Sequence, residues 1–239
     1  MDLSVIVPVH NEEDNILPLL REITQALEGR LDYEIIYVDD GSTDGTAARL
    51  AEARRRHPRL RVLQHAQNCG QSTAMLSGVR AARAPWIATL DGDGQNDPGD
   101  ILRLYRLVAA PEGRAPAMVV GWRRRRNDTL VRRWSSRVAN AVRRRLLGDG
   151  TPDTGCGLKV CSRDIYLALP YFDHMHRFLP ALVQRAGETV ISVPVGHRPR
   201  TAGTSKYGIG NRLWVGIVDL FGVMWLQRRA RNPAVTMRE

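Results

Sequence analysis

Short runs of Val and Ile alternate with longer segments of helical period from residue 3 to about Gly121, and this alternation limits the possible folds more than any other feature. It is typical of a parallel, doubly wound α/β sheet flanked by helices. We therefore expect five strands joined by four helices in the first half of the chain. The expected strands are residues 3–9, 33–38, 60–64, 86–90 and 117–120. The expected helices are residues 15–27, 43–56, 72–82 and 98–109.

The second half of the chain is less regular. The whole chain has 239 residues, of which 43% are hydrophobic, enough for one large core. We expect one catalytic domain over residues 1–208, followed by an apolar and basic C-terminal helix in residues 209–239. The other elements expected here are a helix at residues 128–147, a glycine-containing turn at 153–157 and strands at 158–161 and 189–195.

Polar clusters follow three of the expected strands at the points where they end. Because open α/β sheets bind ligands along the carboxyl edge of their strands, we expect the clusters to form one site. Each loop alone is equally well explained as a helix cap or a turn. The clusters are His10-Asn11-Glu12, Asp39-Asp40-Gly41-Ser42 and Asp91-Gly92-Asp93-Gly94-Gln95.

The third cluster places two carboxylates, Asp91 and Asp93, at the end of an apolar strand, with Gln95 two residues further on. Oxygen ligands at this spacing suit Mg²⁺ or Mn²⁺, which take further ligands from water and substrate phosphates. An ion bridging a nucleotide diphosphate would act as a Lewis acid on the leaving phosphate. The alternative is a solvated turn. We expect these three residues to be metal ligands.

The second cluster contains two adjacent acids, Asp39 and Asp40. Ser42 or Thr43 could cap the helix that follows, which explains one residue of the run but not the pair of acids. The two acids could accept hydrogen bonds from a base N–H or from ribose hydroxyls. No G-x-G-x-x-G fingerprint opens the first expected helix, so a dinucleotide cofactor is disfavoured.

The chain is basic, with 35 Lys and Arg against 25 Asp and Glu and a formal net charge of +10. It should therefore be drawn to polyanions such as nucleic acid, anionic lipid or phosphorylated substrates. Three cysteines without a Cys-x-x-Cys pair disfavour a disulfide framework and a structural zinc site, and favour a reducing cytoplasm. The N-terminal apolar run reads as a strand, not as a signal peptide.

Three segments together resemble family 2 glycosyltransferases in order and spacing. They are Val5 to Glu12, Val38 to Thr46 and Asp91 to Pro98. The resemblance implies a GT-A fold, with His10 where relatives usually have Tyr. The residues that it implies around the nucleotide-sugar are Pro8, His10, Glu12, Asp39, Asp40 and Asp91, and those at the metal are Asp91, Asp93 and Gln95.

Within that family, residues 1–208 look most like dolichyl-phosphate mannosyltransferase and bacterial polyprenyl-phosphate glycosyltransferases. The segments that carry this likeness are Gly121 to Arg123, Arg132 to Ser136, Asp153 to Gly157, in which Cys156 replaces the usual Ser, and Arg198 to Tyr207. The likeness implies that Arg123, Arg132 and Ser136 hold the acceptor phosphate. It also implies that Arg200 and Lys206 close over the donor diphosphate, and that Asp91, Asp93, Arg123 and Arg132 are catalytic.

A polyprenyl phosphate is already anionic at neutral pH, so this reaction needs no general base. Arg side chains match phosphate oxygens in pairs, and a flexible Lys adds a point charge. We therefore expect in-line attack with inversion at the sugar, driven by positioning and charge neutralisation. The donor nucleotide is expected to be UDP or GDP.

Two other functions stay open. A family 2 transferase acting on a hydroxyl of a lipid or polysaccharide would need a carboxylate base, and Asp153 is the only clear candidate after Asp97. A noncatalytic basic scaffold would leave the Asp91 cluster unexplained. Nucleic-acid binding is disfavoured because aromatic residues are sparse around the arginines of residues 114–145. His174, His176 and Arg177 could line a sugar pocket, but a structural role is at least as expected.

The C-terminal segment has aromatic residues near both ends and Arg228 and Arg229 directly after it. This pattern suits a helix lying in the membrane interface on the cytoplasmic face. The alternatives are a helix packed on the domain or a homo-oligomer contact. The apolar stretch of residues 213–226 is interrupted by Asp219 and is shorter than the roughly 20 residues that a membrane span needs.

Overall fold

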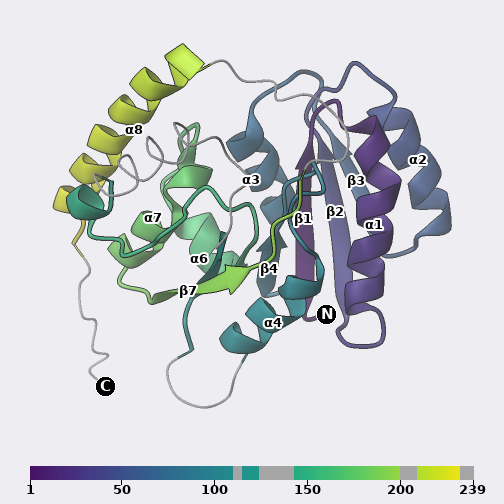
Figure 1. The fold of residues 1–239 in the computed structure, drawn as a ribbon, viewed down its shortest axis with the longest axis horizontal. Helices are drawn as coiled ribbons and strands as arrows, with labels where there is room; N and C mark the ends of the chain where they lie inside the picture. The colour runs from purple at the N-terminus through teal and green to yellow at the C-terminus, as the bar shows by residue number, and fades with distance from the viewer. Residues whose placement is uncertain (110–114, 124–142, 200–208, 232–239) are drawn as a thin grey trace, which may run out of the picture.

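The computed structural model describes residues 1–109, 115–123, 143–199 and 209–231, and in the last of these segments it describes side chains from Trp214 onward (Figure 1). Its centre is a seven-stranded sheet in the order β3-β2-β1-β4-β6-β5-β7. The strands are β1 (Leu3–Val9), β2 (Tyr33–Asp39), β3 (Leu60–Gln64), β4 (Trp86–Thr89), β5 (Met118–Arg123), β6 (Lys159–Ser162) and β7 (Val190–Val195). The prediction of a mostly parallel, doubly wound α/β sheet is confirmed.

Helices cover both faces of the sheet. They are α1 (Glu13–Leu27), α2 (Thr46–Arg56), α3 (Gln71–Ala81), α4 (Gly99–Val108), α6 (Arg163–Ala168), α7 (Leu179–Arg185) and α8 (Ile209–Arg229), with a short 3₁₀ helix, η1 (Met175–Arg177). Figure 1 shows α8 and α2 at opposite ends of the molecule. The expected helix at residues 128–147 lies mostly outside the described residues, and residues 143–147 are helical.

Two hydrophobic clusters fill the space between sheet and helices. Successive residues of a strand point to opposite faces, so Val5 of β1 joins one cluster and Ile6 joins the other. The first cluster contains side chains of α1, α2 and α4, and the second contains side chains of α3, α6, α7 and α8. These two layers of buried side chains anchor the strands whose carboxyl ends carry the polar loops.

One strand runs against the others in the described sheet. β6 is antiparallel to both β4 and β5 and lies between them. In the chain, β5 is the next strand after β4, and the alternation of strands and helices gave no sign that β6 lies between them in the sheet. As a result, the turn at residues 153–157, which leads into β6, lies beside the loop that follows β4.

Candidate active site

The three polar loops lie next to one another because β2, β1 and β4 are neighbours in the sheet. Val9 at the end of β1 is paired with Asp39 at the end of β2, and the Asp40 backbone N–H donates to the Val9 carbonyl at 2.8 Å. The Leu90 N–H, after β4, donates to the Ile6 carbonyl at 3.1 Å. The expected single carboxyl edge is therefore confirmed.

Asp39 has a carboxylate oxygen that the fold does not use. The side chain is only 1% exposed, and its Oδ1 accepts a hydrogen bond from the Ser42 N–H at 3.0 Å. Its Oδ2 is buried and has no hydrogen-bond partner among the described residues. Buried polar atoms are nearly always hydrogen-bonded, so this oxygen is suited to accept a hydrogen bond from a ligand N–H or hydroxyl.

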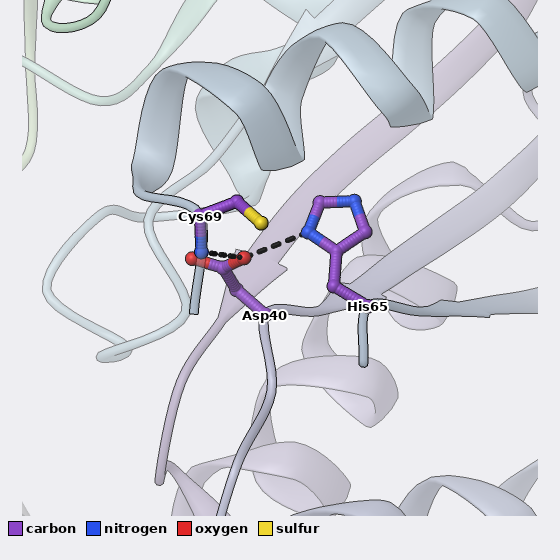
Figure 2. A group of neighbouring side chains, drawn as sticks. All are labelled: Asp40, His65 and Cys69. Atoms are coloured by element: carbon purple, nitrogen blue, oxygen red, sulfur yellow. Dashed lines mark hydrogen bonds and ion pairs between the residues drawn. The ribbon is translucent and has the colours of Figure 1, made fainter. Parts of the chain in front are cut away.

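Asp40 forms hydrogen bonds with the loop that follows β3, as Figure 2 shows for His65 and Cys69. Its Oδ1 lies 2.7 Å from His65 Nδ1 and accepts from the Cys69 N–H at 2.9 Å, and its Oδ2 accepts from the Gly70 N–H at 2.8 Å. Ligand atoms of Asp40, His65 and Cys69 lie within 4.8 Å of one another, which would permit a metal ion. Hydrogen bonds within the chain already use both oxygens of the Asp40 carboxylate. The arrangement is therefore better explained as holding this loop in place than as a metal site.

The first loop is also held by its neighbours. His10 Nδ1 lies 2.9 Å from the Asp40 carbonyl oxygen, and Glu12 Oε2 accepts a hydrogen bond from Asn15 Nδ2 at 2.6 Å. Both side chains are partly exposed at the carboxyl edge. Pro8 lines a cavity at this edge. The nucleotide-binding roles expected for Pro8, His10, Glu12 and Asp40 stay predictions.

Asp91, Asp93 and Gln95 lie together after β4 and offer oxygen ligands. Burial of Asp91 and the charge of Asp93 raise the pKa of the Asp91 carboxyl, so the two carboxylates repel each other. A divalent cation would relieve that repulsion. Gln95 donates its Nε2 to the Arg198 carbonyl at 3.4 Å, which leaves its Oε1 without a hydrogen bond among the described residues. This donor set fits Mg²⁺ or Mn²⁺.

Asp91 also packs closely on the turn that precedes β6. A Cβ atom on Gly157 would lie 2.3 Å from Asp91 Oδ2, a distance that no side chain can occupy. From the other side, Gln71 at the start of α3 donates its Nε2 to Asp91 Oδ1 at 2.8 Å. Glycine at position 157 is therefore what lets the carboxylate sit against the turn.

Arg123 and Asp153 form a two-point ion pair. Arg123 Nε donates to Asp153 Oδ2 at 2.7 Å, and Nη2 donates to Oδ1 at 3.0 Å. Both side chains are largely buried. The arginine thus engages both oxygens of the Asp153 carboxylate, which disfavours Asp153 as a general base. The expected contact of Arg123 with an acceptor phosphate stays a prediction.

A cavity of about 160 Å³ opens beside Asp91. Among its lining residues are three that were not selected as site residues from the sequence: Lys159, His176 and Arg177. The two residues on η1 had been weighed for a sugar pocket, whereas Lys159 had not. The available signal for Lys159 was a single cation inside the apolar run from Leu158 to Cys161.

His176 is held by Ser72 of α3. Its Nδ1 lies 2.8 Å from Ser72 Oγ, and its backbone N–H donates to the same oxygen at 3.3 Å. Burial, followed by the charges of Arg177 and Lys159, holds the pKa of His176 well below its usual range. The imidazole is therefore neutral at physiological pH.

Replacing His176 with glutamine is expected to weaken the loss of stability in acid. The unfolded chain protonates this histidine near pH ~6.5, whereas the folded chain keeps it neutral. The unfolded state thus binds more protons, and the free energy of unfolding falls as pH drops below that value, by up to about 1.4 kcal/mol per pH unit. Urea unfolding at pH 7 and pH 5 measures the difference. A His57→Gln variant, remote from the cavity, should keep the wild-type dependence, and the same dependence in His176→Gln would contradict the assignment.

The segment before residue 200 lies along the loop that follows β4. His197 forms an isolated β-bridge with Asn96, and the Arg198 N–H donates to the Gln95 carbonyl at 2.9 Å. The Arg198 guanidinium pairs with Asp97 at 2.9 Å and with Glu22 of α1 at 2.7 Å. Four residues with expected roles lie outside the described residues: Arg132, Ser136, Arg200 and Lys206.

A model of the family described as glycosyl transferase family 2 matches residues 4–169, more than half of the chain. The chain belongs to this family. A protein of Rhizobium johnstonii named dodecaprenyl-phosphate galacturonate synthase is 38% identical over 98% of the chain and 69% of its own length. An Edwardsiella ictaluri protein named undecaprenyl-phosphate 4-deoxy-4-formamido-L-arabinose transferase is 36% identical over 87% of the chain and 63% of its own length. The chain thus spans about two thirds of these family 2 relatives.

Solved structures with the same fold include two other glycosyltransferases. Glucosyl-3-phosphoglycerate synthase from Mycobacterium tuberculosis, in complex with Mn²⁺, UDP and glucosyl-3-phosphoglycerate, has a TM-score of 0.69 at 20% identity, covering 98% of this chain and 81% of that one. A mannosyltransferase from Pyrobaculum calidifontis, in complex with GDP-mannose and Mn²⁺, has a TM-score of 0.64 at 20% identity, covering 97% and 65%. The predicted family and GT-A fold are confirmed.

Proposed function

We propose that this family 2 glycosyltransferase moves a sugar from a UDP- or GDP-sugar to a polyprenyl phosphate, using Mg²⁺ or Mn²⁺. The relatives from Rhizobium johnstonii and Edwardsiella ictaluri are both named for transfer to a polyprenyl phosphate. Two neighbours in fold were solved with a nucleotide and Mn²⁺. The proposal concerns the part of such a protein that this chain spans.

The observation that carries the proposal is the unused, buried oxygen of Asp39 on the same sheet edge as Asp91 and Asp93. One ligand could satisfy all three carboxylates if it carried a hydrogen-bond donor for Asp39 and an anionic group that binds a metal ion held by Asp91 and Asp93. A nucleoside diphosphate has this form, because its base or ribose donates hydrogen bonds and its diphosphate binds a divalent cation. When bound, the ion would act as a Lewis acid on the leaving diphosphate.

On the acceptor side, Arg123, Arg132 and Ser136 would hold the phosphate, while Arg200 and Lys206 would neutralise the donor diphosphate. The acceptor is its own nucleophile, so the chain needs only to position it in line with the anomeric carbon. Inversion of the anomeric configuration follows from a single displacement. Recovery of a product with retained configuration would refute this mechanism.

The contacts of Asp153 favour a phosphate acceptor over a hydroxyl acceptor. Asp153 was the only clear candidate for a base, and Arg123 engages both of its carboxylate oxygens. A hydroxyl acceptor would need a free carboxylate close to the metal. We therefore keep transfer to a lipid or polysaccharide hydroxyl as the second candidate.

The activity is proposed to take place on the cytoplasmic surface of the membrane, with α8 as the attachment element. No helix in the described part of the chain is long and apolar enough to cross a bilayer. The outer face of α8 instead exposes large apolar side chains, of which Trp214 is 70% and Phe221 is 63% exposed. Such a face suits a helix that lies in the lipid interface, and a homo-oligomer contact is the competing role.

Thermal stabilisation by a panel of UDP- and GDP-sugars, with and without Mn²⁺, tests the donor side of the proposal. We expect one nucleotide class to raise the melting temperature only when the metal is present. A ligand at 100 times its Kd should stabilise the fold by about 2.7 kcal/mol, which is several degrees. Stabilisation without metal dependence would contradict the metal assignment. No shift with any nucleotide would favour a noncatalytic scaffold.

A further inference from the structure

Lys159 places a buried amine in the cavity beside Asp91. Its side chain lies on β6 and is only 3% exposed, and its Nζ donates to the Cys156 carbonyl oxygen. No carboxylate among the described residues is in ion-pair contact with the amine. An ammonium group carries three N–H donors, so two of them have no acceptor within the described structure. Burial lowers the pKa of this amine, and an anion in the cavity would favour its charged form by supplying the missing partners.

Arg177 adds a cation to the same cavity. It ends η1, directly after His176. Its charge opposes the burial that raises the pKa of Asp219 on α8, but no hydrogen bond or ion pair joins its guanidinium to a described residue. The imidazole of His176 is neutral, and the remaining charged residue of the lining is Asp91. Because Asp91 belongs to the proposed metal site, its charge is already matched there. With Asp91 assigned to the proposed metal site, Lys159 and Arg177 face the cavity without a carboxylate in ion-pair contact among the described residues.

We infer that Lys159 and Arg177 form an anion subsite that binds a carboxylate or phosphate group carried by one of the two substrates. The group would accept hydrogen bonds from the free donors of Lys159 and from the Arg177 guanidinium, which matches oxyanions with paired N–H groups. The cavity has room for such a group. This inference rests on the proposed function.

Two substrates could supply the anion. It is either a carboxylate on the donor sugar, as in a uronic acid, or the phosphate of the acceptor. In the first case the subsite selects the sugar. In the second case the subsite orients the acceptor phosphate, which is the nucleophile. Arg123, whose guanidinium is paired with Asp153, would then mainly hold the turn at residues 153–157 in place. In both cases the anion is bound by Lys159 and Arg177, so substitutions of these two residues test both cases.

The variants are Lys159→Met and Arg177→Met, which remove the charge and keep most of the side-chain length. Arg106→Met is the matched control, because Arg106 is an exposed residue on α4, away from the cavity. Calorimetric titration with the nucleoside diphosphate and Mn²⁺ checks the donor site first. We expect affinities within about threefold of wild type for Arg177→Met and Arg106→Met, since neither residue is among the charges that act on Asp91. The charge of Lys159 opposes the rise in the Asp91 pKa, so the substrate preference of Lys159→Met is compared at nucleotide and Mn²⁺ concentrations that saturate this variant.

The decisive comparison uses two ligand pairs, a nucleotide-linked uronic acid against its neutral hexose, and farnesyl phosphate against farnesol. Wild type should prefer the anionic member of one pair, which identifies the source. Lys159→Met and Arg177→Met should each reduce that preference about tenfold or more, and Arg106→Met should keep it. Preferences equal to wild type in both cavity variants, or no preference in wild type, would overturn the inference.

Inorganic phosphate and acetate give a test that does not depend on nucleotide binding. A saturable rise in melting temperature with one of these anions, present in wild type and Arg106→Met and lost in both cavity variants, would support the subsite even if the proposed function failed. The same anion response in all four proteins would overturn it, because general screening of a basic chain then explains the effect.

Discussion

Replacing Asp93 with asparagine is expected to abolish sugar transfer while leaving the fold intact. Asp93 is partly exposed at the carboxyl edge, and its Oδ1 accepts a hydrogen bond from the Gln95 N–H at 3.1 Å. An asparagine oxygen can accept the same bond, so the loop should keep its shape. The substitution removes one of the charges that would hold the metal against the diphosphate. We expect the transfer rate to fall by about 1,000-fold or more.

The measurement is transfer of a labelled sugar to a short polyprenyl phosphate, together with Mn²⁺-dependent nucleotide binding. Both should be lost in Asp93→Asn at an unchanged melting temperature. Asp164→Asn is the matched control, since the Asp164 side chain is 91% exposed on α6 and distant from the edge. It should keep activity within about twofold. More than a tenth of wild-type activity in Asp93→Asn would show that Asp93 does not hold the metal.

Placing aspartates at Phe221 and Trp225 is expected to release the protein from anionic vesicles. Four side chains form one exposed stripe along α8: Trp214 at 70% exposure, Val218 at 57%, Phe221 at 63% and Trp225 at 60%. Their spacing of four, three and four residues places them on a single helix face. Burial of one large apolar side chain contributes about 1.5–3 kcal/mol. Losing two should therefore weaken vesicle binding by about 100-fold or more.

Vesicle flotation of the double variant tests this expectation. The inner face of α8 is left intact, because Val223 is fully buried there and Gln227 donates to the Leu147 carbonyl at 2.9 Å. Deleting residues 213–239 would remove those contacts as well, so the double substitution is the cleaner test. Leu107→Asp, at an apolar residue 37% exposed on α4, is the control and should float as wild type does. Unchanged flotation combined with a loss of oligomers would instead assign the stripe to a homo-oligomer contact.

The first half of the fold could be predicted because each element is specified locally. Every expected strand and helix there appears within three residues of its expected bounds. The largest shifts, of three residues, are the start of α2, at Thr46 instead of Thr43, and the end of β5, at Arg123 instead of Val120. Ser42 Oγ accepts from the Asn11 N–H at 2.9 Å, so it joins two loops, and it is Asp44 Oδ1 that accepts from the Thr46 N–H at 2.9 Å. Cap residues compete for partners that only the folded chain brings close.

The site could be predicted only in part. The motif acids were found because they follow strands, and parallel strands end at one edge. Lys159 and Gln71 were missed because their positions depend on β6 entering between β4 and β5, and on α3 beginning beside Asp91. Those pairings join residues far apart in the chain, and no periodicity in the sequence reports them. The engagement of Arg123 by Asp153 was missed for the same reason.

The pairing of β5 with β6 also bears on how such chains diverge. Residues 124–152 leave from one strand and return to its hydrogen-bonded neighbour, and the two ends are joined by the Arg123–Asp153 pair and by the Gly121 N–H donating to the Leu158 carbonyl at 2.9 Å. A segment closed at its base in this way can change in length and composition at little cost to the sheet. Arg132 and Ser136, the proposed acceptor-phosphate residues, belong to that segment. If they hold the acceptor, its recognition can evolve, or be transplanted between relatives, while the proposed nucleotide site stays as it is.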